Sequence, residues 1–359
     1  MIIIVVAICI VYIMECFLES IFESSYAING TCFKHSMVIL STELVPEIPQ
    51  ATVKSLENDA SVEKSVPVSA QYINFTIPVS PTHAFVFGTN DAANQEILVE
   101  KYNIELLSGR LPDSGKDEIA LDGNVALSNQ LTIGSHVGSD LDKSQALLGN
   151  YVVVGILKND SHISLMGSPA FEQNSSGTLK RGRAGLLIFP NEGCFAQAEK
   201  ASIALMSQGF DIYTLTRYNN LIKANSATSN TLDIMVVLLI LVMLVCLVCS
   251  KYAQYFARKS ELGILNALGY TRHEIMMRTF WEVVITNSAG FIVGLALAVL
   301  LCRVIMGAAF EAIGAVGVYF YGKAVVLSLL APLFTALFTL IPVYRMIGRI
   351  DPISIIEKN

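Results

Sequence analysis

The chain has 359 residues, of which 53% are apolar and only 15% charged, and its formal net charge is −6. Soluble domains carry about 25% charged residues, so this composition excludes an ordinary soluble protein and indicates a membrane protein. Residues 31–230 contain 14 Lys and Arg against 20 Asp and Glu, and this mildly acidic balance argues against nucleic acid as a partner.

The first apolar segment lies at the start of the chain. Met1–Met14 has no charged residue, and the apolar run then continues between three glutamates that share one helical face, Glu15, Glu19 and Glu23. Fourteen residues span only about 21 Å of the roughly 30 Å of hydrocarbon. We therefore expect residues 1–23 to form a first spanning helix and stalk whose cytoplasmic start is missing from this sequence. A signal sequence is the alternative, although no basic residue precedes the run and no clear cleavage site follows it.

Residues 24–230 have the pattern of a folded domain of mixed structure. Short β-branched runs such as Tyr151–Leu157 and Gly185–Phe189 alternate with turn residues, and helical patterns occur around residues 123–131 and 192–209. Because no strict βαβ repeat is present, we predict one α+β domain. Its two cysteines, Cys32 and Cys194, form one disulfide only if the compartment is oxidising, and the sequence leaves this open.

Three further spans follow within residues 231–359. Residues 234–250, 283–302 and 324–344 are uncharged and of spanning length. Basic residues are concentrated in 251–282 and after the last span, which predicts that both stretches are cytoplasmic. The predicted architecture is therefore four transmembrane helices, one and then three, with the 24–230 domain inserted between the first and second and facing outward, as does the loop near 303–323.

Residues 251–282 are predicted to form a helical hairpin. Apolar Leu262, Leu265 and Leu268 recur at three-residue spacing, Gly269 can cap the end of that helix, and Thr271 with Glu274 forms a capping box for the next one. A short, rigid and partly apolar helix at the inner surface suits a partner that pushes on it. A connector that only caps its own ends is the alternative.

The hairpin resembles a known family. Residues 258–272, RKSELGILNALGYTR, are similar to the signature of FtsX-like permeases of ATP-binding cassette (ABC) transporters of the MacB type, and residues 349–353 resemble the end of the same domain. The likeness covers about residues 232–359. It implies that residues 251–282 form the coupling hairpin, seated in a groove of an ATPase subunit, and that the coupling residues are Glu261, Leu262, Gly263, Ala267, Leu268, Gly269 and Arg272.

The 24–230 domain resembles the periplasmic core domain of MacB-type proteins. Residues 107–112, LSGRLP, residues 118–121 followed by 131–134, and residues 151–157 match short elements of that domain in order. Little likeness is present before about residue 60 or from 160 to 225. These two regions are expected to carry whatever is specific to this protein.

Chemical motifs are absent from the sequence. It contains no GxxxxGK[ST] phosphate loop, no HExxH, no GxSxG and no zinc-ligand spacing. We therefore expect no catalytic, cofactor-binding or metal-binding residues and no enzyme activity in this chain. ATP and Mg²⁺ would be bound by a separate ABC ATPase subunit.

The third span carries small residues at four-residue spacing: Thr286, Gly290, Gly294, Ala298 and Cys302. Small side chains let helix backbones approach closely, and we assign Gly290, Gly294 and Ala298 to helix packing. The sequence leaves open whether the partner helix belongs to this chain or to another.

The resemblance implies a type VII ABC permease in the bacterial cytoplasmic membrane, working as a homo- or heterodimer with two ATPase subunits and, in some cases, an extracytoplasmic adaptor. ATP hydrolysis would drive the outer domain by mechanotransmission, for efflux or extraction of peptides, lipids or amphiphiles. The alternative is an FtsX-like regulator that activates an extracytoplasmic cell-wall hydrolase. Half of a larger two-repeat permease also fits, whereas a membrane-anchored enzyme is disfavoured by the missing motifs.

Overall fold

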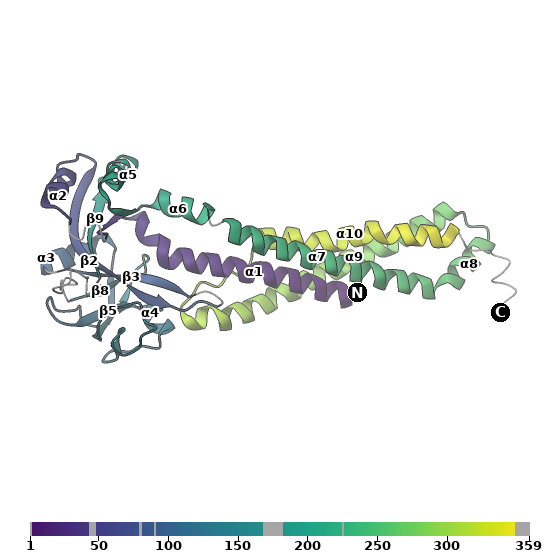
Figure 1. Cartoon of the computed structure of the whole chain (residues 1–359). Helices are drawn as coiled ribbons and strands as arrows, with labels where there is room; N and C mark the ends of the chain where they lie inside the picture. Colours follow the sequence, from purple (N-terminus) through teal and green to yellow (C-terminus); the bar gives the residue numbers. More distant parts are fainter. Residues whose placement is uncertain are drawn as a thin grey trace. The chain divides into compact units, whose positions relative to one another are not determined.

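The computed structural model describes residues 2–42, 48–78, 81–89, 91–167, 182–224 and 226–348 (Figure 1). It divides into two compact units. The helical bundle comprises Met1–Ser20, Ser226–Gly307 and Val318–Asn359, and the sheet domain comprises Ile21–Asn225 and Ala308–Gly317. Each unit is described by itself below.

The sheet domain is built on one mixed sheet. Its strands are β1 (Met37–Leu40), β2 (Val62–Phe75), β3 (Thr82–Gly88), β4 (Glu105–Gly109), β5 (Glu118–Asp122), β6 (His136–Val137), β7 (Tyr151–Lys158), β8 (Ser164–Met166), β9 (Arg183–Pro190) and β10 (Asp211–Tyr213). The order across the sheet is β10-β1-β9-β2-β3-β8-β5-β7-β4, with β6 paired to β7. Two pairs, β3 with β8 and β5 with β7, are parallel, and the other pairs are antiparallel.

At β1 and β9 both faces of the sheet are buried, because successive side chains of a strand point to opposite faces and here both sets are apolar. In β1, Val38 and Leu40 join one core with Leu98 of α3 (Ala92–Lys101). Met37 and Ile39 join the other core, with residues of α2 (Gln50–Glu57) and α5 (Phe195–Ala204). The remaining short helices of this domain are η1 (Thr31–Lys34), α4 (Gly123–Ser128), η2 (Leu205–Gln208), α6 (Leu215–Ala224) and η3 (Glu311–Ile313).

The bundle consists of α1 (Ile2–Gly30, of which residues 21–30 belong to the sheet domain), α7 (Ser226–Ala257), α8 (Lys259–Ala267), α9 (Arg272–Ala309) and α10 (Gly322–Gly348). One apolar cluster joins four of these helices through Ile8 of α1, Leu247 of α7, Phe291 of α9 and Ala331 of α10. In the part of the chain that the structure describes, four helices are long and apolar enough to cross a membrane, within Ile2–Lys34, Ile234–Ala257, Arg272–Ile313 and Gly322–Thr339. The chain is thus a membrane protein with a large mixed α/β domain between its first and second apolar helices.

The loop between α9 and α10 packs with the sheet domain, although the sequence indicated only a short connector. A Cβ atom on Gly314, whose φ is +76°, would lie 2.7 Å from the carbonyl oxygen of Asn124 in α4. The backbone of Val316 forms two hydrogen bonds with the Ser24 hydroxyl, at 3.0 and 3.1 Å. Residues 308–317 therefore fold with the domain formed by Ile21–Asn225, although α7, α8 and α9 lie between them in the chain.

The two cysteines of this domain are both free thiols in the structure. Cys32 is buried in the core that contains Phe33 and Phe85, whereas Cys194 directly precedes α5 at the opposite core. The disulfide that the sequence left open is therefore not formed here.

A candidate coupling hairpin

Arg258 lies at the bend between α7 and α8 and connects three helices. Its Nε and Nη2 donate to the two carboxylate oxygens of Glu261 in α8 over 2.7 and 2.9 Å. Its Nη1 donates to Oε1 of Glu282 in α9 over 2.6 Å. These hydrogen bonds raise the pKa of the Arg258 guanidinium, and the bonds to Glu261 contribute more than the bond to Glu282. Bidentate pairing fixes the geometry as well as the charge, so the bend is held in one shape.

α8 has an inward and an outward face. Leu262 is buried against Tyr255 of α7 and Ile275 of α9, and Leu265 packs on the same cluster. On the other side, Ile264 is 53% exposed and Leu268 is 71% exposed. Because a helix has 3.6 residues per turn, Glu261, Ile264 and Leu268 share the outward face. An anchored helix thus presents one acidic and two apolar side chains.

The turn after α8 is a Schellman motif. Gly269 has φ +94°, its N–H donates to the carbonyl of Asn266 over 3.1 Å, and the N–H of Tyr270 donates to that of Leu265 over 3.2 Å. These two bonds satisfy carbonyls that the end of the helix leaves free, and only a residue that tolerates positive φ fits between them. The predicted cap at Gly269 is confirmed.

The start of α9 is fixed by the predicted capping box. The Thr271 hydroxyl accepts from the N–H of Glu274 over 3.3 Å, and the N–H of Thr271 donates to the Glu274 carboxylate over 2.8 Å. The reciprocal pair satisfies two donors that the first turn cannot pair internally. α8 is therefore capped at its end and α9 at its start, which makes the reversal between them well defined.

The coupling residues predicted from the sequence differ in burial: some are exposed and others are buried. Glu261 and Leu268 face outward, whereas Leu262 and Gly263 are buried within the bundle. Leu262, Leu265 and Leu268, which recur at three-residue spacing, do not all lie on one face of α8. Each three-residue step falls about 60° short of a full turn, so two steps rotate Leu268 away from the core.

The other predicted residues lie around the turn. Gly269 forms the turn and Arg272, exposed, begins α9. Ala267 is the last residue of α8, and the structure describes its backbone but not its side chain. Residues 349–353 lie outside the described residues. Ile264 was missed, although its position three residues after Glu261 and four before Leu268 was a usable signal.

The small residues of α9 lie on a buried stripe of that helix. The stripe runs through Ile275, Thr279, Val283, Asn287, Gly290, Gly294, Ala298, Cys302 and Met306. A Cβ atom on Gly294 would lie 3.2 Å from Cβ of Ile8 and 3.3 Å from Cα of Val5, so α1 of the same chain packs here. The backbone approach at Gly294 is therefore within the chain, and Thr286 is replaced on the stripe by Asn287.

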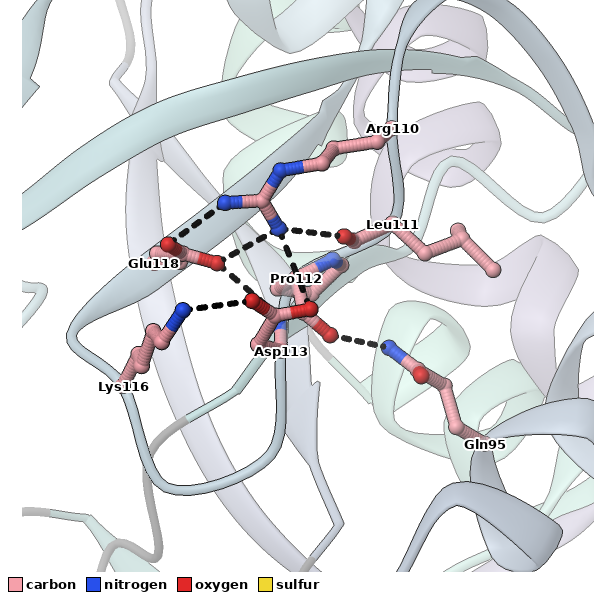
Figure 2. Close-up of polar contacts among 7 residues, drawn as sticks. All are labelled: Gln95, Arg110, Leu111, Pro112, Asp113, Lys116 and Glu118. Carbon is pink, nitrogen blue, oxygen red and sulfur yellow. Dashed lines mark hydrogen bonds and ion pairs between the residues drawn. The ribbon is translucent and has the colours of Figure 1, made fainter.

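The LSGRLP motif of the sheet domain forms a polar network (Figure 2). Arg110 donates to both carboxylate oxygens of Glu118 over 2.8 and 2.6 Å, and the backbone N–H of Asp113 donates to the same carboxylate over 3.0 Å. Lys116 pairs with Asp113 at 2.7 Å, and Gln95 of α3 donates to the carbonyl of Pro112 over 3.1 Å.

The network closes the loop that follows the edge strand β4. The hydrogen bonds from Arg110, above all, lower the pKa of Glu118 to about 2. Each charged side chain in the network pairs with one of opposite charge. Among the described residues no group of three or more His, Cys, Asp and Glu side chains could hold a metal ion.

Residues 234–352 match the model of the FtsX-like permease C-terminal family. This part of the chain is an FtsX-like permease domain. The FtsX-like domain contains α7 from Ile234 onward, the whole 251–282 hairpin and both later spans. The resemblance inferred from residues 258–272 is therefore confirmed for this part of the chain.

Two solved structures similar to the chain each cover about half of it. One is the periplasmic region of MacB from Actinobacillus actinomycetemcomitans, at 13% identity and a TM-score of 0.32, covering 53% of this chain and 94% of that chain. Another is the extracellular domain of the noncanonical ABC-type transporter YknZ from Gram-positive bacteria, at 11% identity and a TM-score of 0.30, covering 50% of this chain and 99% of that chain. No curated protein sequence matches the chain.

Proposed function

We propose that this chain is the membrane-spanning subunit of an ABC transporter, and that its 251–282 hairpin receives the ATPase subunit on the cytoplasmic side. The proposal is carried by the outward face of α8. Ile264 and Leu268 are exposed on a helix that is anchored on its other side by Leu262 and at its start by Arg258. Exposed apolar side chains on a rigid, charge-rimmed element outside the spans are typical of a protein interface.

The same contacts provide a route for motion. Arg258 ties the start of α8 to Glu282, and α9 continues without a break from Arg272 to Ala309, about 57 Å at 1.5 Å per residue. The chain then enters the 308–317 loop, which folds with the sheet domain. A push on α8 would be transmitted by this helix and loop to an extracytoplasmic domain, which is the mechanotransmission that the sequence implied.

ATP and Mg²⁺ belong to the partner subunit in this proposal, because the sequence has no phosphate loop. The complex would be a dimer of permease chains, with this chain as a homo- or heterodimer partner, in the cytoplasmic membrane of a bacterium. Its cargo would be a peptide, lipid or amphiphile that the outer domain exports or extracts.

The test is co-purification with a candidate ABC ATPase and stimulation of its ATP hydrolysis. Ile264→Asp and Leu268→Asp place a carboxylate in the interface and should each reduce association at least tenfold. Leu141→Asp is the matched control, since Leu141 is 58% exposed but lies in the sheet domain. If both hairpin variants bind and stimulate the ATPase like the parent protein, α8 is not the coupling element.

A regulatory role is the second candidate, and one observation favours it. Leu107 and Leu127 of the sheet domain are 58% and 50% exposed, and Leu127 lines an apolar hollow of about 510 Å³ with Ile133 and Ile156. Such a surface could bind a hydrolase outside the membrane. Capture of a cell-wall hydrolase by the outer domain, lost in Leu127→Asp, would favour this role over export.

A further inference from the structure

A groove between α9 and α10 carries a second site that is independent of the coupling hairpin. Its volume is about 450 Å³, and its walls are almost wholly apolar, with Phe280, Phe291 and Ile292 from α9 and Leu329 and Leu333 from α10. Pockets of 300–1,000 Å³ with apolar walls and a few placed polar groups are typical of small-ligand sites.

Two polar side chains, Asn287 and Ser288, interrupt the apolar wall. Asn287 is only 4% exposed, and its Nδ2 donates to the carbonyl of Pro332 in α10 over 2.9 Å. Its Oδ1 has no hydrogen-bond partner in the described part of the chain. A buried amide oxygen without a donor costs about 1–3 kcal/mol in proteins, and hydrocarbon supplies no water to relieve it. Asn287 lines the groove, so its Oδ1 is a buried acceptor in the groove wall for which the described residues supply no donor.

The position of Asn287 defines the shape of the occupant. It lies five residues, or about 7.5 Å along the helix, beyond Glu282, the last charged residue before the apolar segment 283–302. Further along the groove, Ile292 of this segment and Leu329 of α10 offer no polar atom from their side chains. An occupant thus needs a hydrogen-bond donor near the membrane boundary and an apolar chain beyond it.

We propose that this groove binds one amphiphile from the bilayer, with its apolar chain along Phe291 and Leu329 and a hydroxyl or amide N–H of its head donating to Oδ1 of Asn287. A hydrocarbon tail alone would fill the volume and leave the acceptor unpaired. The concave, drug-sized shape of the groove suits a single small molecule better than the ridge of a second transmembrane helix. The proposal does not depend on the ATPase partner.

The test uses the full chain in phosphatidylcholine nanodiscs, whose headgroups have no donor. Two photoactivatable probes are compared: a diacylglycerol with a diazirine in one acyl chain, and the same molecule with its hydroxyl methylated. Their sole difference is the donor. Peptides from 280–292 and 329–337 should be labelled about tenfold more by the hydroxyl probe, which corresponds to about 1.4 kcal/mol. Equal labelling by the two probes overturns the proposal.

Three variants make the result specific. Asn287→Leu should remove the discrimination between the probes. Leu333→Trp fills the groove from a side chain that is 51% exposed, so it should abolish labelling without disturbing the fold. Ile285→Trp, at a 64% exposed position of α9 that does not line the groove, is the control and should label like the parent. Discrimination that persists in Asn287→Leu, or labelling that persists in Leu333→Trp, contradicts the assignment.

A second copy of the chain is the competing occupant, and it can be detected directly. With Leu333→Cys, an interchain disulfide that forms in the membrane and excludes the hydroxyl probe would show that another permease helix covers the groove. Retention of probe labelling without this disulfide supports the amphiphile.

Discussion

Arg258 and Glu282 form an ion pair in which Nη1 donates to Oε1 over 2.6 Å, joining the start of α8 to α9. Both side chains are partly exposed, at 40% and 44%, so this pair contributes modestly to stability and its main effect is to fix an angle. The position of α8 therefore depends on a charge that a single substitution can remove.

Glu282→Gln should loosen the hairpin without unfolding the bundle. Amide hydrogen exchange in residues 259–268 should rise by up to about fivefold, because only one exposed ion pair is lost. The parent protein in about 1 M salt should approach the same exchange rate, because the Debye length is then about 3 Å and salt screens this partly exposed ion pair. Unchanged exchange in the variant would mean that the pair does not hold α8.

Gly269→Ala should weaken the Schellman turn. Alanine at φ +94° costs about 1–2 kcal/mol, and the open space around this position adds no steric term. Exchange of the amide hydrogens of residues 269 and 270, which donate in this turn, should rise, and ATPase stimulation should fall. Gly322→Ala is the control, because Gly322 also lies in open space but has no positive φ. Equal effects of the two substitutions would argue against a conformational cause.

Gly109→Ala should disrupt the sheet domain far more than Gly115→Ala. The two glycines have similar φ, +80° and +84°, but a Cβ atom on Gly109 would lie 2.2 Å from the carbonyl oxygen of Val154, whereas nothing lies within 4 Å of one on Gly115. We expect Gly115→Ala to cost about 1–2 kcal/mol and Gly109→Ala to exceed 3 kcal/mol. Limited proteolysis at increasing temperature measures both, and similar midpoints would contradict the close approach of β4 and β7.

The Arg110–Glu118 pair should make the sheet edge sensitive to acid. Its hydrogen bonds lower the pKa of Glu118 from 4.5 to about 2. A lowered carboxyl pKa stabilises the folded state above the unfolded pKa, so the contribution is complete above about pH 4.5 and is lost as pH falls toward 2. Protection of residues 105–122 from exchange should therefore differ between the parent and Glu118→Gln at pH 5–7, and this difference should shrink below pH 4.5.

Glu105→Gln provides the comparison for that experiment. Glu105 lies on β4, which is separated from the strand of Glu118 by β7; it is 63% exposed and stands 3.7 Å from Lys158, so its removal should change little. A difference between the parent and Glu118→Gln that stays constant down to pH 2.5 would refute the assigned cause.

Gly294→Val should separate α1 from α9. Two added methyl groups would meet Val5 and Ile8, where even a single Cβ atom lies at 3.2–3.3 Å. Overpacking of this kind typically costs about 1–3 kcal/mol, which thermal unfolding in detergent can detect. Ala289→Val, on the exposed side of α9, should have little effect. Equal unfolding temperatures would show that α1 does not depend on this approach.

Local features of the hairpin could be predicted because they depend on few consecutive residues. The Gly269 cap and the Thr271–Glu274 box are determined by backbone geometry and side chains within one turn. The three-residue spacing alone could not predict the face occupied by Leu268, since that face depends on which side of α8 meets Tyr255 and Ile275. The partner of the small-residue stripe was also open until α1 was placed against Gly294.

The sequence by itself determined the membrane class, the four apolar helices, the capped reversal at 269–271 and the FtsX-like domain. These features depend on the length of apolar segments and on local capping, and both involve residues that are adjacent in the chain. Only the tertiary structure decided that the 308–317 loop folds with the sheet domain, that Arg258 binds Glu282 and that Asn287 faces a groove with an unpaired oxygen. Each of these joins residues that are far apart in the chain or belong to different helices, so each depends on how the elements pack.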